Sequence, residues 1–387
     1  MPRDGLRLGI DLGTSNTVAV LHRAGGRDIT LLMFDGTPVL PSAVYWGPGG
    51  PLVGADAVHG ARLRPELFEP NPKLHIDDGT VLLGEHEVPV TALIAAVLRR
   101  VAGEAVRVGG QAPDAVSLAH PATWGPRRRE VLALAAAEAG LGPVDLVAEP
   151  IAAAWHFMLG RVEPLPVGAM IVVYDFGAGT FDASVVRRTN QGFEVLATGG
   201  LPDVGGLDID AAIMAYLGAE YADRDRSAWR RLTAPASTTD RRANRQLWDD
   251  VRRAKEILSR ASGTHVQLPL LDVDAPLGRE QLETLAGPLV RRTVLAVRSL
   301  LRGAGIAEQD LAGVYLVGGS SRLPLAATLL HHELGIAPEV IEQPELAVAQ
   351  GCLLAAAQSG EAPDGAPVGA TDHAGDVDHL AAVAVTD

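Results

Sequence analysis

The sequence predicts an α/β protein with two lobes around a central cleft, each lobe built on a mixed sheet flanked by helices. Three observations support this fold class. The chain has 387 residues, which is enough for two domains with separate cores. Apolar runs with strand periodicity alternate with runs of helical periodicity. A strand–Asp–Gly–Thr pattern occurs at Asp11 and again at Asp175, and this separation indicates a duplication on the scale of half the molecule.

The second copy, residues 171–186, has the sequence IVVYDFGAGTFDASVV and predicts a β-hairpin. Its turn consists of Gly177, Ala178, Gly179 and Thr180, which are too small to form a side-chain pocket. Small residues let backbone N–H groups approach an anion closely, and glycine can adopt the positive φ that points successive amides inward. The turn is therefore a predicted phosphate-binding loop.

The first copy, residues 8–20 (LGIDLGTSNTVAV), repeats this arrangement near the N-terminus. Its turn residues are Gly13, Thr14 and Ser15. In each copy an aspartate ends the first strand, where it can hold a hydrated Mg²⁺, an ion that usually takes one or two carboxylates together with phosphate oxygens. Two such hairpins facing one another would clamp a phosphate chain, with Asp11 and Asp175 as the metal ligands.

Composition excludes several classes of partner. The formal net charge of −14 argues against nucleic acid, because phosphate backbones require a basic face.

The single cysteine, Cys352, allows no intrachain disulfide and is predicted to be buried in a helix. The sequence has no basic, apolar leader before its first strand and no apolar run of about 18 residues. We therefore expect a cytoplasmic protein that does not span a membrane.

Lysine usage is unusual. Of the 33 cationic side chains, only Lys73 and Lys255 are lysines. A chain that uses arginine almost everywhere else could need a compact ammonium at these two positions rather than a planar guanidinium, although two cases also leave chance open. Residues before proline avoid the α region, so the segment 70–73 around Lys73 is predicted to be extended.

Other segments place further polar residues at the ends of strands and helices. Glu149, followed by a proline, begins a predicted helix, where a carboxylate is electrostatically favoured. A helix over 241–259 carries Lys255 and Ser259 one turn apart. A helix over 279–302 is predicted to be interrupted near its Gly-Pro pair. A strand over 313–317 leads into Gly318, Gly319, Ser320 and Arg322, a junction that either presents free amides or packs tightly.

Taken in chain order, these motifs resemble the nucleotide-binding domain of the heat-shock protein 70 (DnaK-like) chaperone family over roughly residues 6–360. The resemblance implies ATP or ADP with Mg²⁺ as ligands and ATP hydrolysis as the activity. Lys73 matches the family's essential lysine, and Thr180 lies in the second phosphate loop. Glu149 and Asp182 are both candidates to orient the attacking water, and the sequence does not choose between them. The residues implied to contact nucleotide are Gly13, Thr14, Ser15, Gly177, Ala178, Gly179, Thr180, Gly205, Gly206, Lys255, Ser259, Gly318, Gly319, Ser320, Arg322 and Glu345.

The fold that this resemblance implies is the actin-like ATPase, in which a ribonuclease H-like motif is duplicated. Lobe I is expected over residues 1–165 with a small subdomain at about 38–90, and lobe II over 166–340 with a small subdomain at about 205–286. A closing helix at 341–360 is expected to return to lobe I. Residues 361–387 are rich in Gly, Pro and Asp and are predicted to be a disordered tail or linker.

Three departures from the family pattern bear on function. Ala178 stands where glycine is usual, and Arg252 stands where the adenosine-contacting helix is usually acidic. No substrate-binding β-domain follows in the sequence, so we expect either a truncated member or a stand-alone ATPase domain.

The leading hypothesis is a slow, Mg²⁺-dependent ATPase that acts as a nucleotide-driven conformational switch of the chaperone type. The resemblance implies a monomer with a relay through Pro121 and Glu149 to a co-chaperone, a nucleotide-exchange factor or a client protein. The alternative is a catalytically silent nucleotide sensor or protein-interaction module, which Arg252 and the missing substrate domain favour. An actin-like filament former is a third hypothesis.

Overall fold

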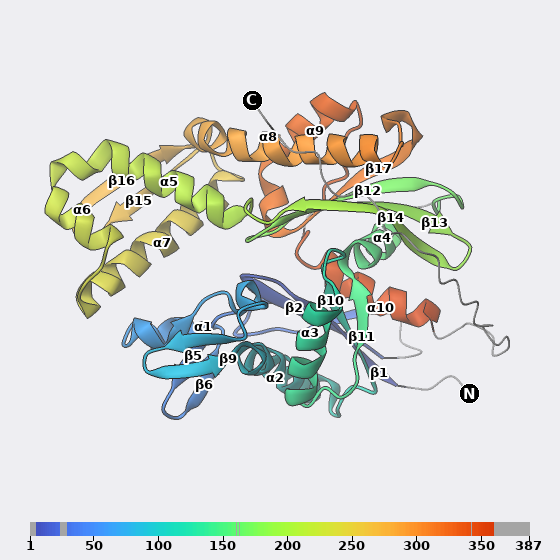
Figure 1. Ribbon diagram of the computed structural model, residues 1–387, viewed down its shortest axis with the longest axis horizontal. Helices are drawn as coiled ribbons and strands as arrows, with labels where there is room; N and C mark the ends of the chain where they lie inside the picture. Colours follow the sequence, from blue (N-terminus) through green and yellow to red (C-terminus); the bar gives the residue numbers. More distant parts are fainter. Residues whose placement is uncertain (1–4, 24–28, 160, 162, 342, 360–387) are drawn as a thin grey trace, which may run out of the picture.

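The computed structural model describes residues 5–23, 29–159, 161, 163–341 and 343–359, and two large sheets form the two halves of this part of the chain (Figure 1). The first sheet has the strand order β11-β10-β1-β2-β3, with β4 also paired to β2. Its strands are β1 (Leu6–Leu12), β2 (Asn16–Arg23), β3 (Ile29–Leu31), β4 (Val39–Pro41), β10 (Ala115–His120) and β11 (Asp145–Ala148).

The second sheet repeats the central topology of the first. Its order is β14-β13-β12-β17. Its strands are β12 (Met170–Phe176), β13 (Phe181–Thr189), β14 (Gly192–Leu201) and β17 (Leu311–Val317). In each half, an antiparallel hairpin (β1–β2 or β12–β13) has a parallel strand beside its first member and an antiparallel strand beside its second. The predicted duplication and α/β fold class are therefore confirmed.

Helices cover the outer faces of both sheets. Alternate residues of β1 pack under α2 (Val90–Gly109) and α3 (Pro126–Glu138), because a strand turns every second side chain to the same face. The second sheet packs in the same way against α5 (Gly206–Tyr221), α8 (Arg279–Gly303) and α9 (Pro324–Leu334).

Two further helices lie between the sheets. α4 (Glu149–Leu159) packs on β12 and β17 of the second sheet, and α10 (Ala347–Ser359) packs on β2 of the first. The two helices also pack on each other, as Figure 1 shows near the centre of the molecule. Cys352 of α10 is fully buried at this contact, as predicted. The inner faces of both sheets are therefore joined through one helix pair.

Smaller units flank the space between the halves. On the first side they are α1 (Ala55–Gly60), the sheet β6-β5-β7 (Gly50–Val53, Val44–Gly47, Phe68–Glu69) and the hairpin β8–β9 (Thr80–Leu83, His86–Pro89). On the second side they are α6 (Arg226–Thr233), α7 (Thr238–Leu258) and the hairpin β15–β16 (Gly263–Leu268, Val273–Gly278), packed with α5. The residue boundaries given above for lobes and subdomains stay predictions. The predicted tail, 361–387, lies outside the described residues.

Two local predictions were wrong. The helix near Pro288 is not interrupted, because α8 runs continuously through it. Ala286 and Val290 on either side of that proline are buried, so tertiary packing holds the helix despite one missing N–H. Lys73 is not in an extended segment but in the 3₁₀ turn Pro72–His75. The proline restricts the residue before it, Asn71, and is itself well suited to begin a helical turn.

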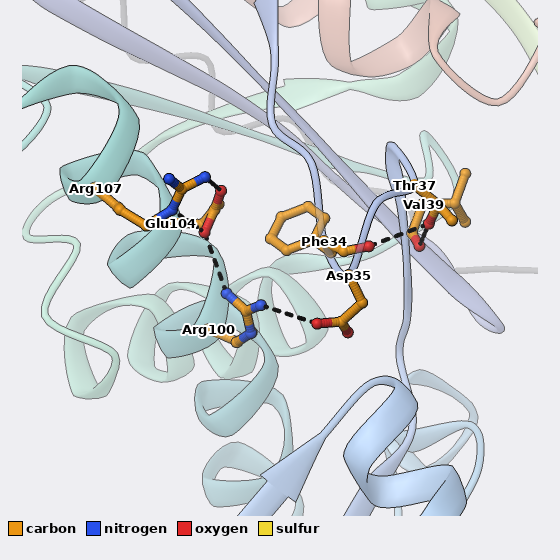
Figure 2. A network of polar contacts seen from close by, with 7 residues as sticks. All are labelled: Phe34, Asp35, Thr37, Val39, Arg100, Glu104 and Arg107. Carbon is orange, nitrogen blue, oxygen red and sulfur yellow. Dashed lines mark hydrogen bonds and ion pairs between the residues drawn. The ribbon is translucent and has the colours of Figure 1, made fainter.

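A polar network attaches the turn before β4 to α2 (Figure 2). Asp35 has a positive φ of 52°, an uncommon conformation for a residue other than glycine. Its carboxylate lies 3.7 Å from Arg100 of α2, and the same guanidinium reaches Glu104 at 3.5 Å. Thr37 Oγ1 donates hydrogen bonds to the carbonyls of Phe34 and Val39 and closes the turn. The network thereby fixes the entry to β4, the strand that runs beside the first hairpin.

The helix pair between the sheets yields a stability prediction. A Cβ added at Gly351 would overlap the backbone carbonyl of Ala152, which cannot move without shifting α4. We expect Gly351→Ala to lower the free energy of unfolding by about 3 kcal/mol, in the upper range of overpacking effects. Gly103→Ala in α2 is the matched control, because it meets open space, and it should raise stability by about 0.5–1 kcal/mol. Urea unfolding followed by circular dichroism measures both, and equal behaviour of the two variants would contradict the close-packing account.

Candidate functional site

A cleft of about 900 Å³ lies between the two halves and is lined by residues of both hairpin turns, of the segment 73–77 and of α5 and α7. It brings together most of the predicted site residues from distant parts of the sequence. They are Asp11, Gly13, Thr14, Ser15, Lys73, Glu149, Asp175, Gly177, Ala178, Thr180, Asp182, Gly206, Lys255, Ser259, Gly318, Gly319, Ser320, Arg322 and Glu345. Gly205 does not line the cleft but packs behind the second turn, against Ala178, and Gly179 of that turn lies against the lining residues Thr14 and Leu74.

The two hairpin turns have the same backbone closure. Gly13 N–H donates to the Asn16 carbonyl and Gly177 N–H donates to the Thr180 carbonyl, both at 3.0 Å. The turns also face one another, since a Cβ on Gly179 would lie 3.1 Å from Thr14 Cγ2. The sequence repeat is thus a structural repeat, and its two tips meet across the cleft.

Several amides at these tips remain available to a ligand. Within the described part of the chain, the N–H groups of Thr14, Ser15, Ala178 and Gly179 donate to no protein acceptor. The carbonyls on the other side of the first turn are held by Ser42, whose Oγ donates to Gly13 O at 2.9 Å and whose N–H donates to Ser15 O at 2.9 Å. Rigid turns with open amides are suited to anionic oxygens.

Four carboxylates gather at the floor of the cleft. Asp11 and Asp175 occupy equivalent strand positions, and strand register places Asp182 directly opposite Asp175. The fourth, Glu149, begins α4. Burial, and then the charge of Glu149, raise the pKa of Asp11 to about 7. Burial also raises the pKa of Asp175 well above its usual range, with further contributions from Glu149, Asp182 and Asp11. The protein alone therefore leaves this cluster with uncompensated negative charge.

Lys73 is the cation that reaches the cluster. Its Nζ donates to Glu149 Oε1 at 3.1 Å and lies 5.2 Å from the centre of the Trp124 ring. Burial alone would lower the pKa of Lys73, but Glu149 and Asp11 outweigh burial and raise the pKa above its usual value. The turn that carries Lys73 is tied to α3 by the ion pair between Asp77 and Arg128, with Nη2 and Oδ2 2.6 Å apart. The lysine is thus charged and held from two directions.

Asp182 is contacted from both halves of the molecule. Thr180 Oγ1 donates to one of its oxygens at 3.1 Å, and Thr123 Oγ1, from the segment after β10, donates to the other at 3.4 Å. Burial, and then the charge of Glu149, raise the pKa of Asp182 against the effect of these hydrogen bonds. A partly buried carboxylate with a raised pKa is a suitable proton acceptor.

The opposite end of the cleft is formed by α7, the junction after β17 and the residues before α10. Gly318 has φ of 80°, and a Cβ there would lie 2.6 Å from the Phe176 carbonyl, so only glycine fits this junction. Lys255 pairs with the buried Asp210, and Ser259 Oγ donates to the Glu256 carbonyl. Arg322 lies 3.4 Å from Glu345 Oε1. The Gly-Gly junction packs tightly at Gly318 and also lines the cleft, and the presentation of free amides to a ligand stays a prediction.

Sequence reasoning missed several contributors. Thr123, Trp124 and Asp210 reach the site or its supports only through contacts between segments far apart in the chain. Asp210 lies two residues beyond Asp208, whose carboxylate accepts the Gly205 N–H at 2.7 Å. Only Asp208 lies in the first turn of α5 and Asp210 lies beyond it, so nothing in the local sequence marked Asp210 as the partner of Lys255.

Asp11 and Asp175 are the predicted ligands of a Mg²⁺ ion. The described residues contain no group of three or more His, Cys, Asp or Glu side chains able to hold a metal ion on their own. Mg²⁺ needs no such cage, since one or two carboxylates with water and phosphate suffice. Asp11 and Asp175, whose pKa values are raised by burial and by neighbouring carboxylates, fit a divalent cation.

The duplicated sheets and the cleft between them define the class of protein, an actin-like ATPase fold with a nucleotide-binding cleft. Comparison with known families agrees, since the family model described as Hsp70 protein matches residues 77–365. The chain belongs to the Hsp70 family and corresponds to its nucleotide-binding region.

Individual relatives are similar over most of the chain. A chaperone protein HscA homolog of Bordetella petrii is 34% identical over 378 residues, covering 91% of this chain and 58% of the relative. The chaperone proteins HscA of Pectobacterium atrosepticum and Edwardsiella ictaluri are 32% and 33% identical, with the same shares covered. The chain therefore spans less than two thirds of the length of these relatives. No helix in the described part of the chain has the length and apolar character needed to cross a membrane.

The crowded carboxylates yield a pH prediction. Asp11 has a pKa near 7 in the folded protein against 3.8 as its ordinary value, so folding becomes less favourable as pH rises from about 4 to 7 and is constant above. Asp11→Asn removes this penalty. We expect the nucleotide-free variant to be about 2 kcal/mol more stable than the parent at pH 8 and little different at pH 4, a discounted figure because the carboxyl partly faces water.

Urea unfolding with a chelator present measures this difference at several pH values. A variant less stable than the parent at pH 8, or a gain that does not vary with pH, would contradict the proposed crowding.

Proposed function

We propose that this chain binds ATP with Mg²⁺, hydrolyses it slowly and acts as a nucleotide-driven conformational switch of the chaperone type. The observation that supports this most directly is the juxtaposition of two equivalent glycine-containing turns above a cluster of four carboxylates and Lys73. Phosphoryl transfer depends mainly on positioning and charge neutralisation, which such a site can supply. Membership of the Hsp70 family supports nucleotide as the ligand.

The two turns are proposed to hold the phosphates. The open amides of Thr14, Ser15, Ala178 and Gly179 would donate to phosphate oxygens, and the hydroxyls of Thr14 and Ser15 would add to them. Lys73 would neutralise charge that develops on the transferred phosphoryl group. Its ion pair with Glu149 and its contact with the Trp124 ring keep the ammonium oriented before the ligand arrives.

Asp11 and Asp175 are proposed to hold the Mg²⁺. When bound there, the ion would neutralise negative charge on the phosphates. The two carboxylates come from opposite halves of the molecule, so a ligand that requires both of them favours one relative placement of the halves. This differential contact is the proposed origin of the switch.

Asp182 is proposed to accept the proton of the attacking water. Glu149 Oε1 already accepts a hydrogen bond from Lys73. Asp182 has a raised pKa, and hydrogen bonds from Thr180 and Thr123 orient its carboxylate. Glu149 would act through Lys73 as a positioning residue. Of the two candidates that the sequence leaves open, the proposal therefore takes Asp182 as the base.

The switch is proposed to report to another protein. Pro121 and Glu149 both line the cleft, and a relay from them to the surface is what the family implies. The partners would be a co-chaperone, a nucleotide-exchange factor or a client protein, in line with the word chaperone in the names of the relatives. The proposed working form is a monomer in the cytoplasm.

Single-turnover hydrolysis tests the proposed activity. The parent chain should hydrolyse bound ATP slowly in Mg²⁺, and Lys73→Ala should reduce the rate by roughly 10²-fold or more while ATP binding persists, because charge neutralisation is lost at the transferred group. A chelator should abolish hydrolysis. Tight ATP binding without lysine-dependent hydrolysis would instead support the silent nucleotide sensor, and ATP-dependent sedimentation would support the filament former.

The pH dependence of the same rate tests the assignment of the base. A general base works when deprotonated, so the rate should fall as pH drops through the pKa of Asp182, and the raised pKa places this fall at a higher pH than for an ordinary aspartate. Asp182→Asn should lower the rate by roughly 10²-fold and remove the acidic limb. Glu149→Gln should lower the rate but retain the limb. Loss of the limb in Glu149→Gln alone would reverse the assignment.

A further inference from the structure

Lys255 is held almost entirely by the protein itself. Its Nζ donates to the Gly206 carbonyl at 2.6 Å and lies 2.8 Å from Asp210 Oδ1. The side chains of Lys255 and Asp210 are only 12% and 1% exposed. The Lys255 ammonium is therefore hydrogen-bonded to one residue of α5 and ion-paired with another.

The first turn of α5 in turn holds the second hairpin turn. Gly206 N–H donates to the Gly177 carbonyl at 3.1 Å, and Leu207 N–H donates to the Ala178 carbonyl at 2.8 Å. Ser320 Oγ donates to the same Gly177 carbonyl at 2.7 Å. These bonds occupy the carbonyl side of the turn, while the amides of Ala178 and Gly179 donate to no acceptor in the described part of the chain.

We propose that Asp210 is a positioning residue for the phosphate-binding turn, acting through Lys255 and the first turn of α5. Lys255 lies on α7, at the proposed nucleoside end of the cleft. Through its bond to the Gly206 carbonyl it would nevertheless fix the turn that binds the phosphates. This inference rests on the proposed function, because it specifies which part of the nucleotide depends on the Lys255–Asp210 pair.

The physical basis is the cost of leaving a buried charge without its partner. Replacing Asp210 by asparagine leaves the Lys255 ammonium in a nearly dry site with the Gly206 carbonyl as its remaining close acceptor. Arg252, whose Nε lies 4.0 Å from Asp210 Oδ2, cannot replace Asp210, because it is a second cation and repels the ammonium. The ammonium must then move toward water, and the Gly206 segment loses its anchor.

Amide hydrogen exchange of the nucleotide-free protein tests the structural half of the proposal. Asp210→Asn should speed exchange at the Gly206 and Leu207 amides by roughly tenfold or more, because these protons bond the hairpin turn. The matched control is Asp223→Asn, which makes the same chemical change in an ion pair with Arg226 whose partners are both more than 80% exposed, and it should leave both amides unchanged. Unchanged exchange in Asp210→Asn would overturn the proposal.

Ligand affinity tests the functional half. Equilibrium dialysis with radiolabelled ADP and adenosine measures both affinities, at protein concentrations that detect both ligands in the parent. In Asp210→Asn the affinity for ADP should fall roughly tenfold, whereas the affinity for adenosine should change less than about twofold. Equal losses for both ligands would mean that Lys255 serves the nucleoside directly and would overturn the proposal. Lys255→Met removes the donor to Gly206 and should reproduce both results, so it carries the test if Asp210→Asn does not fold.

The two proposals fail in different ways. If the parent chain binds neither ADP nor adenosine, the proposed function fails, and the exchange experiment still decides whether Asp210 orders the turn. If the parent binds ADP and hydrolyses ATP but Asp210→Asn leaves the turn and the ratio of affinities unchanged, only the role of Asp210 fails.

Discussion

Repulsion among carboxylates at the floor of the cleft is the interaction around which this structure is organised. Asp11, Asp175, Asp182 and Glu149 meet there with Lys73 as the opposing charge, and burial strengthens every interaction among them. A fold selected only for stability would separate these groups. This fold instead aligns two strand ends and a helix N-terminus so that they cannot separate. The site is consequently ready for a cation and an anionic ligand before either arrives, in the way that preorganised catalytic sites usually are.

The scaffold that bears this repulsion is the pair of helices between the sheets. α4 delivers Glu149 to the cluster and packs on the second sheet, while α10 packs on the first. Gly351 allows the backbones of the two helices to touch. The helix pair therefore joins the inner faces of both sheets across a short distance. Movement of one half relative to the other must therefore pass through this contact, which connects the proposed nucleotide site to the packing of both sheets.

The sequence predicts the parts of the fold that local patterns encode. The paired Asp–Gly–Thr hairpins, the helix at Glu149 and the Gly-Gly junction at Gly318 all carry short-range signals, and the cleft brings them together. Thr123, Trp124 and Asp210 carry no such signal, because each acts on a residue that becomes its neighbour only after the halves have folded. The unbroken helix at Pro288 was missed because tertiary packing, which the local sequence does not show, holds it. The turn at Lys73 was missed because the restriction that a proline imposes applies to Asn71 before it and not to Lys73 after it.

The two hairpins differ at one register position. Asp182 lies opposite Asp175 in the second hairpin, whereas Val18 lies opposite Asp11 in the first. The two hairpins thus present different groups to the cleft although their backbones match. If Asp182 is the base, as proposed, a ligand with two unlike ends would react in a single orientation, so the molecule has a direction that its duplicated backbone does not possess.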